Sequence, residues 1–208
     1  MYPFPESKKD RCPAGDLSSC RDAASSLPYT AMPIELQAVT PVALVFAVLA
    51  DCEQTLATSK EQLAQYFGPL RAASEVYAFD YTSYYQGEMG ANLQKQLVCC
   101  TERIDPSKLA AIKTQTIELE RQMARATEDT LQRRANIDPG LLSIESLVLA
   151  TSKYSGHRIC IAPQLYAELT LLYQKGRYQP FAWTYLDYQS ETLQDFLLES
   201  RTWLMATR

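Results

Sequence analysis

The sequence predicts an α+β fold with an extended, mostly antiparallel sheet. Apolar runs of strand length alternate with two segments of helical period, and further strand-like segments follow before a final amphipathic helix. The first part is expected to run strand, helix, strand, strand, helix, strand, which is the order of a ferredoxin-like split βαβ core. The second part is expected to enlarge that sheet and to end in a C-terminal helix.

The expected core begins with a strand over 42–49, VALVFAVL, which is apolar at every position. Such a run is typical of a central strand covered on both faces. A helix over 53–67 follows and ends at Gly68-Pro69, a C-terminal cap and then a breaker. The second and third strands are expected over 75–79 and 97–101.

The second helix of the core is expected to begin at Asp105-Pro106, with Asp as N-cap and Pro at the first helical position. Apolar or small side chains recur at steps of three and four, which gives one buried stripe of Leu109, Ile112, Thr116, Leu119 and Met123. A fourth strand over 134–138 is expected to break at Pro139-Gly140, because this dipeptide is typical of turns.

The rest of the chain is expected to contain a short helix over 144–150. Three strands are expected after it, over 158–162, 165–173 and 178–183. A turn at Lys175-Gly176 separates the last two strands. The final helix, over 190–205, places its apolar residues on one side, namely Leu193, Phe196, Leu197, Trp203 and Leu204.

Residues 1–38 are predicted to be a disordered or loosely docked tail. They contain five prolines, at positions 3, 5, 13, 28 and 33, and show neither a helical nor a strand period. Such a segment lacks the apolar surface needed to offset the entropy of ordering. Residues 39–208 are expected to form a single α+β domain.

Composition excludes several classes of partner. The net charge of −4 and the pI near 5.1 argue against general binding to a nucleic-acid backbone. The six cysteines include no C-x-x-C pair, and a single histidine cannot complete a two-histidine zinc site. The longest apolar stretch, 41–50, is too short for a bilayer, which needs roughly 20 residues per helix. We expect a cytoplasmic protein with no membrane partner.

The loop after the expected strand 75–79 is the first candidate site. Asp80 and Glu88 could hold a divalent cation such as Mg²⁺ or Mn²⁺ through carboxylate oxygens. Tyr84 and Tyr85 could stack on a base or donate to a phosphate. A Gly-rich connection with packing tyrosines explains the same residues equally well.

The second candidate is the expected strand end near Asp138. Arg134, Asn136 and Asp138 alternate, so the three side chains are expected to share one face. Together they suit contact with a metal or a phosphate. Turn formation by Asp138-Pro139-Gly140 is the alternative for Asp138, and it does not account for Arg134 or Asn136.

The third candidate is a cationic loop that contains Lys153, His157 and Arg158. Such a loop suits an anion, because arginine binds a phosphate as a fork and lysine binds it as a point charge. His157, the only histidine, is a candidate general acid or base. A surface or structural histidine is the alternative.

Glu168 and Thr170 lie two apart in an apolar strand, so both are expected on one side. A carboxylate in such a strand needs a partner, and Arg134, Arg158 and Lys153 are the candidates. A structural ion pair and a ligand-binding carboxylate explain Glu168 equally well.

Trp183 and Tyr185 offer aromatic faces that could wall a nucleobase pocket, or simply pack against the final helix. The sequence contains no G-x-x-x-x-G-K-[ST] phosphate loop, no G-x-G-x-x-G after a strand and no G-x-S-x-G nucleophile elbow.

Several of these stretches recur together in a known pattern. They are Phe79-Asp80-Tyr81-Thr-x-Tyr84-Tyr85-x-x-Glu88-Met89-Gly90, Ile104-Asp105-Pro106, Ile112-Lys113, Asn136-Ile-Asp138-Pro139-Gly140, Leu147-Val-Leu-Ala-Thr151-x-Lys153, His157-Arg158-Ile159, Tyr166-Ala-Glu168-x-Thr170-Leu and Trp183-Thr-Tyr185-x-Asp187-Tyr188. In this combination the chain, from about Pro41 to its C-terminus, resembles an uncharacterised bacterial family, domain of unknown function 4416. The chain departs from the family pattern at Ser83, Ile117 and Leu186.

The resemblance implies a fold boundary and a choice of residues, and it leaves the function open. Members of the family are often labelled GTP-binding, but this chain contains none of the GTPase loop motifs.

Our leading hypothesis is a protein that binds a nucleotide or another phosphorylated small molecule, with Mg²⁺ or Mn²⁺ as a candidate cofactor, and that could act on it as an enzyme. The candidate catalytic residues are His157, Asp138 and Glu168, and the candidate metal ligands are Asp80, Glu88 and Asp138. The candidate ligand-binding residues are Arg134, Asn136, Lys153, Arg158, Tyr84, Tyr85, Thr170, Trp183 and Tyr185. The alternatives are a non-enzymatic protein-interaction module and an RNA-binding module, the latter disfavoured by the acidic pI.

Overall fold

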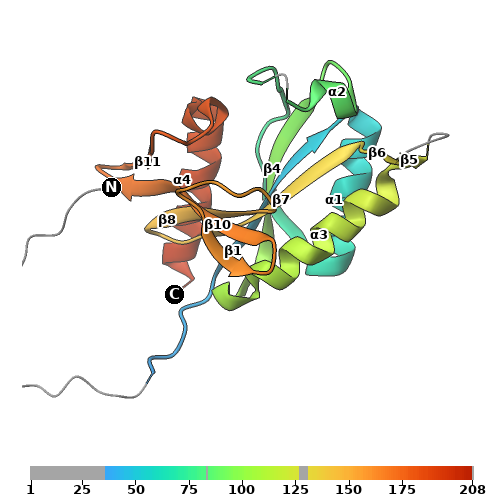
Figure 1. Ribbon diagram of the computed structural model, residues 1–208. Coiled ribbons are helices and arrows are strands. Elements are labelled where there is room, and N and C mark those ends of the chain that lie inside the picture. The colour runs from blue at the N-terminus through green and yellow to red at the C-terminus, as the bar shows by residue number, and fades with distance from the viewer. Residues whose placement is uncertain (1–35, 83, 127–130, 208) are drawn as a thin grey trace, which may run out of the picture. The chain divides into compact units, whose positions relative to one another are not determined.

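The computed structural model describes residues 36–82, 84–126 and 131–207, and residues 38–208 form one compact unit. The predicted tail over 1–38 lies almost entirely outside the described residues. The described part of the unit contains a nine-stranded sheet in which every pair of neighbouring strands is antiparallel (Figure 1). The predicted α+β class, the mostly antiparallel sheet and the C-terminal helix are confirmed.

Four strands of the sheet follow the order β7-β1-β4-β2. They are β1 (Val42–Ala50), β2 (Leu70–Ala73), β4 (Gln94–Ile104) and β7 (Ala135–Leu142). Two helices connect them, α1 (Glu53–Phe67) after β1 and α3 (Leu109–Met123) after β4. The expected helix over 53–67 and the buried strand over 42–49 are therefore present where the sequence predicts them.

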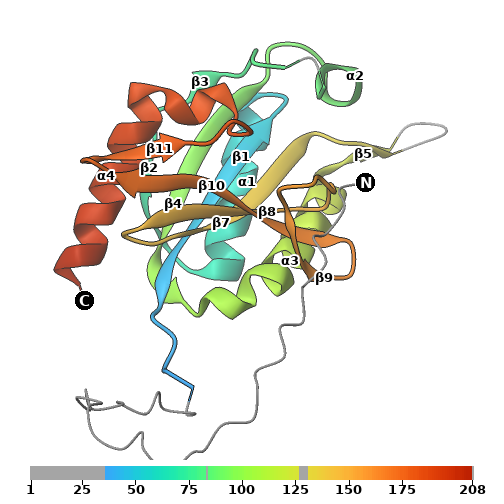
Figure 2. The ribbon, with the colours of Figure 1, turned by 60° about the vertical axis from the view of Figure 1, so that its left-hand side comes forward.

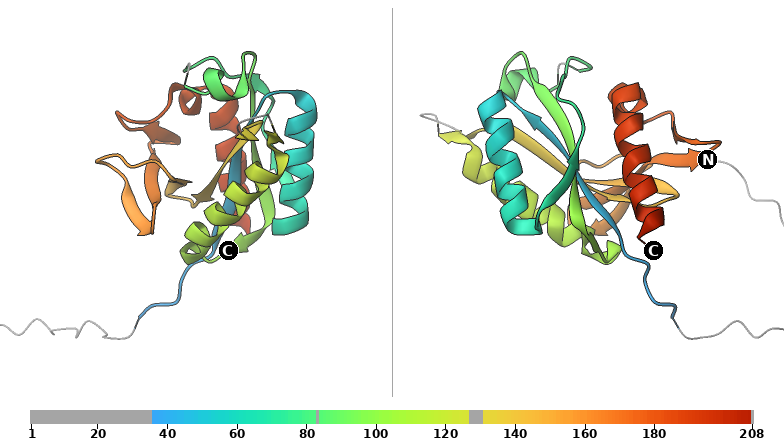
Figure 3. Two further views of the ribbon diagram at one scale, coloured as in Figure 1. Left: turned by 45° about the vertical axis from the view of Figure 1, so that its right-hand side comes forward. Right: turned by 180° about the vertical axis from the view of Figure 1, so that it is seen from behind.

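The central strand β1 is buried on both faces. Leu44, Phe46 and Val48 pack in the layer formed with α1 and α3. Ala43 and Val45, which alternate with them, pack in the layer formed with the C-terminal helix α4 (Glu191–Ala206), on the other side of the sheet (Figure 3). Because neighbouring residues of a strand point to opposite faces, two covered faces require an unbroken apolar run.

Three strands extend the sheet beyond β7, in the order β8-β10-β11, and a fourth, β9, pairs with β10 (Figure 2). Their bounds are β8 (Ser146–Thr151), β9 (Ile159–Ala162), β10 (Leu165–Gln174) and β11 (Arg177–Pro180). The turn expected at Lys175-Gly176 joins β10 to β11, and both residues have positive φ angles.

The predicted helix over 144–150 is wrong, because this segment forms β8. The Ser143 hydroxyl accepts hydrogen bonds from the backbone N–H groups of Glu145 and Ser146, which makes a tight turn. Leu147 then pairs with Leu142 of β7. A short apolar run has no period that separates a helix from a strand, so the pairing with β7 decides the outcome.

The predicted break at Pro139-Gly140 is also wrong, because β7 continues through both residues. The backbone groups of Ile137 point away from β1 and bond side chains of α3. Pro139, two residues on, has the same orientation, so its missing N–H falls where no other described strand pairs with β7. Pairing with β8 begins one residue later, at Gly140 opposite Leu149.

The other described elements are short. They are β3 (Tyr77–Ala78), α2 (Gln86–Met89), β5 (Arg125–Ala126), β6 (Leu131–Gln132) and the 3₁₀ turns at Pro106–Lys108 and Leu186–Gln189. The strand expected over 75–79 overlaps β3 but misses β2, and the strand expected over 178–183 ends at Pro180. None of the helices described here is long and apolar enough to cross a membrane.

Candidate functional site

A cleft of about 840 Å³ opens where β7 and β8 separate. The two strands pair only from Gly140 to Leu142, so residues 135–139 of β7 have no neighbouring strand on that side among the described residues. Helix α3 forms one wall, and side chains of β8, β10 and the loops at 85–88 and 152–158 form the others. Many lining residues are charged: Glu88, Lys95, Lys113, Glu118, Glu120, Arg121, Arg133, Asp138, Lys153, Arg158 and Glu168.

Two buried side chains of α3 cover the open edge of β7. Lys113 Nζ donates to the backbone oxygen of Ile137 at 2.8 Å, and Glu120 Oε1 accepts from the N–H of the same residue at 2.8 Å. Lys113 also lies 3.5 Å from Glu120. The two side chains thereby satisfy both backbone groups that a neighbouring strand would otherwise bond.

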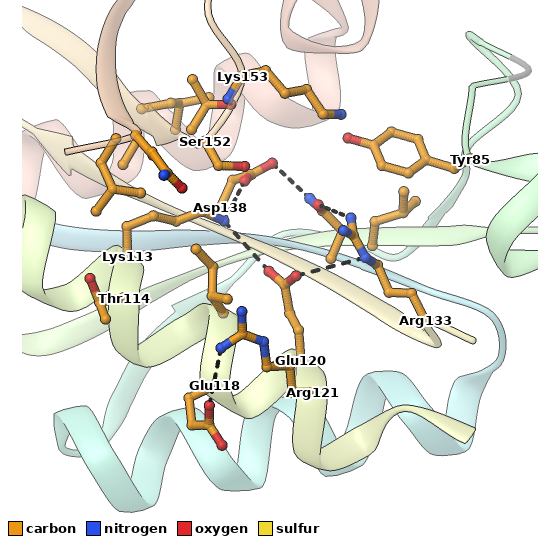
Figure 4. Close-up of a pocket in the computed structure, with 18 of the residues that line it drawn as sticks. Tyr85, Lys113, Thr114, Glu118, Glu120, Arg121, Arg133, Asp138, Ser152 and Lys153 are labelled. Carbon is orange, nitrogen blue, oxygen red and sulfur yellow. Dashed lines mark hydrogen bonds and ion pairs between the residues drawn. The ribbon is translucent and has the colours of Figure 1, made fainter. Parts of the chain in front are cut away.

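Asp138 projects from this edge into the cleft (Figure 4). Its Oδ1 accepts from Lys113 at 2.9 Å, and its Oδ2 accepts from the Asn136 amide at 2.7 Å. Burial alone would raise the pKa of Asp138, but the Lys113 ammonium and these hydrogen bonds outweigh it and lower the pKa. Asp138 is therefore a carboxylate with both oxygens already engaged.

The opposite wall holds a second carboxylate, Glu168. Its Oε2 lies 2.8 Å from His157 Nε2 and 2.7 Å from Arg158 Nε. The His157 ring stacks on Trp183, with 4.8 Å between ring centroids, and its Nδ1 lies 3.1 Å from the Ser155 hydroxyl. Of the three partners considered for Glu168, only Arg158 forms the ion pair.

Two cations of the cleft are not neutralised at close range. Lys153 Nζ lies 3.8 Å from the ring centroid of Tyr84 and 4.9 Å from that of Tyr85, and no described carboxylate lies within 4.0 Å of it. Arg133 Nε forms two long ion pairs, with the carboxylates of Glu88 and Glu120, each 3.9 Å away. Figure 4 shows Lys153 extended toward Tyr85, above Asp138.

Most of the residues predicted for a site lie in this cleft. Eight of them line it: Tyr85, Glu88, Asn136, Asp138, Lys153, Arg158, Glu168 and Tyr185. They come from segments up to about a hundred residues apart. Three further predicted residues lie beside the cleft without lining it. Tyr84 contacts Lys153, His157 contacts Glu168, and Trp183 stacks on His157.

Arg134 does not join them, contrary to the prediction. Strand β7 begins at Ala135, so the strand alternation does not extend back to Arg134. Its Nε donates to Asp51 Oδ2 at 2.8 Å, on the side of α1. Arg133, which the sequence analysis missed, reaches the cleft instead and donates to the Asn136 side-chain oxygen at 3.1 Å.

Thr170 is also turned away from the cleft, although it lies two residues from Glu168. The pairing of β10 with β8 is irregular between Leu169 and Leu171, which breaks the period of two. The Thr170 side chain is fully buried, and its hydroxyl donates to the backbone oxygen of Glu168.

The predicted metal ligands are not brought together. Glu88 and Asp138 line the cleft, but Asp80 does not. Within residues 36–82, 84–126 and 131–207, no group of three or more His, Cys, Asp or Glu side chains is placed to hold a metal ion.

Lys113 and Glu120 are the main site residues that the sequence analysis overlooked. A signal exists, because both fall on the stripe of α3 that also contains Ile112, Thr116 and Leu119. Charged residues at buried positions of an amphipathic helix need partners, and they often mark a site.

The fold and the cleft define an α+β protein with a charged, ligand-sized cavity at the point where its sheet splits. Residues 40–203 match the family described as Domain of unknown function (DUF4416), and the chain belongs to this family. The family predicted from the sequence is thereby confirmed. Comparison with curated proteins and with solved structures gives no significant match.

Proposed function

We propose that the protein binds a small phosphorylated molecule, a nucleotide or a sugar phosphate, in the cleft beside β7. The observation that carries this proposal is the Lys153 ammonium, which borders the cleft and has no carboxylate of the described residues within 4.0 Å. The volume of about 840 Å³ lies within the ~300–1,000 Å³ typical of small-molecule sites.

The distribution of charge favours an anionic group at one end of the cleft. Lys113 and Arg158 are matched at short range by Asp138 and Glu168. Lys153 has no described carboxylate within 4.0 Å, so its charge is available to a ligand, whereas Arg133 is shared between Glu88 and Glu120 at 3.9 Å each. An arginine fork and a lysine point charge together suit a phosphate group.

The same distribution disfavours an extended nucleic acid. The chain carries a net charge of −4, and Lys153 borders a cavity that also contains Asp138 and Glu168. A nucleic-acid backbone needs a row of cations along its path, whereas a small ligand needs only one cationic point.

Mg²⁺ or Mn²⁺ would enter with the phosphates of the ligand in this proposal. The protein would supply positive charge through Lys153 and Arg133. Titrations with and without the divalent ion separate recognition of the free phosphate from recognition of its metal complex.

Isothermal titration calorimetry with ribose 5-phosphate, glucose 6-phosphate and nucleoside mono-, di- and triphosphates tests the proposal. We expect saturable binding of at least one compound, accompanied by a higher melting temperature. Lys153→Gln should weaken that binding about tenfold or more, since it removes a charged hydrogen-bond donor. Lys108→Gln, which removes an exposed lysine outside the cleft, should leave binding unchanged.

Two results would refute the proposal: no binding across the panel, or equal binding by the Lys153→Gln variant. ³¹P NMR of the same samples over several hours would show whether a bound compound is also converted. If a bound compound is converted, the Asp138→Asn variant tests whether the Asp138 carboxylate takes part, because this carboxylate faces the cleft.

A further inference from the structure

Three residues that line the cleft carry polar groups with no hydrogen-bond partner among the residues that the structure describes. Tyr85, Tyr188 and Glu168 all line the cleft, and their exposed fractions are 8%, 1% and 4%. Neither tyrosine hydroxyl forms a hydrogen bond with any residue that the structure describes, and Glu168 Oε1 accepts none.

These groups are open to the cleft and are not sealed in the core. The fully enclosed side-chain atoms that lack a partner belong to other described residues, Gln94, Gln96 and Asp187. A polar group taken out of bulk water without a hydrogen bond costs about 1–3 kcal/mol. Three such groups lining one cavity indicate a surface that is complementary to something bound there.

The hydrogen-bonding capacity of the three groups is specific. Burial, followed by the negative charges of Asp187 and Asp138, raises the pKa of Tyr188, and burial likewise raises the pKa of Tyr85. Both hydroxyls therefore keep their protons and can donate. Glu168, held by Arg158 through Oε2, presents Oε1 as an acceptor.

Two donors and an acceptor in one cleft fit a ligand that both accepts and donates hydrogen bonds. A second phosphate would offer no donor to Glu168, and an ammonium group would offer no acceptor to the tyrosines. A hydroxyl group does both. Several hydroxyls on neighbouring carbons would engage all three protein groups.

We infer that the ligand is a phosphorylated polyol, such as a sugar phosphate or a ribonucleotide, whose hydroxyl groups bind Tyr85, Tyr188 and Glu168 while its phosphate lies near Lys153. This inference rests on the phosphate site proposed above. In this inference Tyr85, Tyr188 and Glu168 select ligands that carry hydroxyl groups. Lys153 binds the phosphate.

Calorimetry with ribose 5-phosphate, glucose 6-phosphate and pentyl phosphate tests this inference, because pentyl phosphate keeps the phosphate and a carbon chain but lacks the hydroxyls. We expect at least one of the sugar phosphates to bind about tenfold or more tightly than pentyl phosphate. Tyr188→Phe, which removes one oxygen atom from a buried ring, should reduce this preference several-fold. Binding of pentyl phosphate itself should not change.

Tyr173→Phe is the matched control, since it removes a tyrosine hydroxyl outside the cleft. Glu168→Gln should also reduce the preference. If that variant fails to fold after losing its bonds to His157 and Arg158, Tyr188→Phe still decides the matter.

The outcomes separate the two proposals. Equal binding of all three phosphates would overturn the polyol inference and leave the phosphate site standing. Failure of every phosphate to bind would overturn both. An unchanged preference in Tyr188→Phe would remove Tyr188 from the recognition surface and overturn the assignment of this subsite.

Discussion

The ammonium group of Lys113 lies 2.9 Å from Asp138 Oδ1 and thereby joins helix α3 to the open edge of strand β7. The same nitrogen donates to the backbone oxygen of Ile137. One helix side chain therefore stabilises the strand edge at the place where β8 has diverged, and it holds Asp138 at the surface of the cleft.

Replacing Lys113 with Met should destabilise the fold by about 3 kcal/mol, because it leaves Glu120 and Asp138 without their buried partner. Urea denaturation at pH 7 measures this loss. Lys108→Met, at an exposed position, should change stability by less than about 0.5 kcal/mol. A loss below about 1 kcal/mol for Lys113→Met would contradict the structural role assigned to this residue.

Gly140→Ala should destabilise the protein by about 1–3 kcal/mol through overpacking. A Cβ at this position would lie 2.7 Å from Leu149 Cδ2 and 3.1 Å from Val45 Cγ2, between β8 and β1. The Gly87→Ala control has no atom within 4 Å of the added carbon and should be close to neutral. Thermal unfolding of the two variants side by side decides the prediction, and equal melting temperatures would contradict it.

Stability should fall as the pH rises above about 10. Burial raises the pKa of Tyr77, Tyr85, Tyr178 and Tyr188 above the ordinary value of 10.0. The unfolded chain then releases these protons at a lower pH than the folded chain, so the tyrosine contribution is complete below pH 10 and is lost above it.

Urea midpoints between pH 8 and 11 measure this effect. The decline should be shallower in Tyr188→Phe, which has one fewer buried phenol. If the slopes of the wild type and the variant coincide, burial of Tyr188 does not raise the pKa of its hydroxyl.

The two neighbouring arginines should behave differently. Arg133→Ala is expected to weaken the binding of a phosphorylated ligand, because Arg133 lines the cleft. Arg134→Ala should leave binding unchanged and lower stability by no more than about 1 kcal/mol, since its partly exposed ion pair is with Asp51. Calorimetry with ribose 5-phosphate and urea denaturation of both variants separate the two roles, and weaker binding in Arg134→Ala alone would reverse the assignment.

The sequence analysis was accurate where local chemistry decides the structure. The helix over 53–67 has the predicted bounds because its period and the Gly68-Pro69 stop agree. Asp105 accepts from the Ser107 N–H, and Ser190 caps α4 by accepting from the Leu193 N–H. Capping depends on residues three or fewer positions apart, so the sequence contains the whole signal.

The predictions were wrong where a distant segment decides the structure. The segment 144–150 is a strand because β7 pairs with it, and β7 passes through Pro139 because its edge is open there. The direction of the Arg134 side chain likewise depends on where β7 begins and on the presence of Asp51. None of these partners lies within a local window of sequence.

The candidate site shows the same division. The residue types were identified from the sequence, since a carboxylate such as Glu168 in an apolar strand needs a partner wherever the chain places it. The cleft itself could not be identified, because it exists only where β7 and β8 diverge and α3 covers the gap.

Local sequence signals were enough to predict the α+β class, the buried central strand, the helix over 53–67 and the family. These follow from hydrophobic period, capping and motif, which act between near neighbours in the chain. That Asp138, Lys153 and Glu168 share one cleft with Lys113 and Tyr188 follows from the folded arrangement alone. Long-range strand pairing sets that arrangement, and the register of distant strands is fixed by their mutual packing.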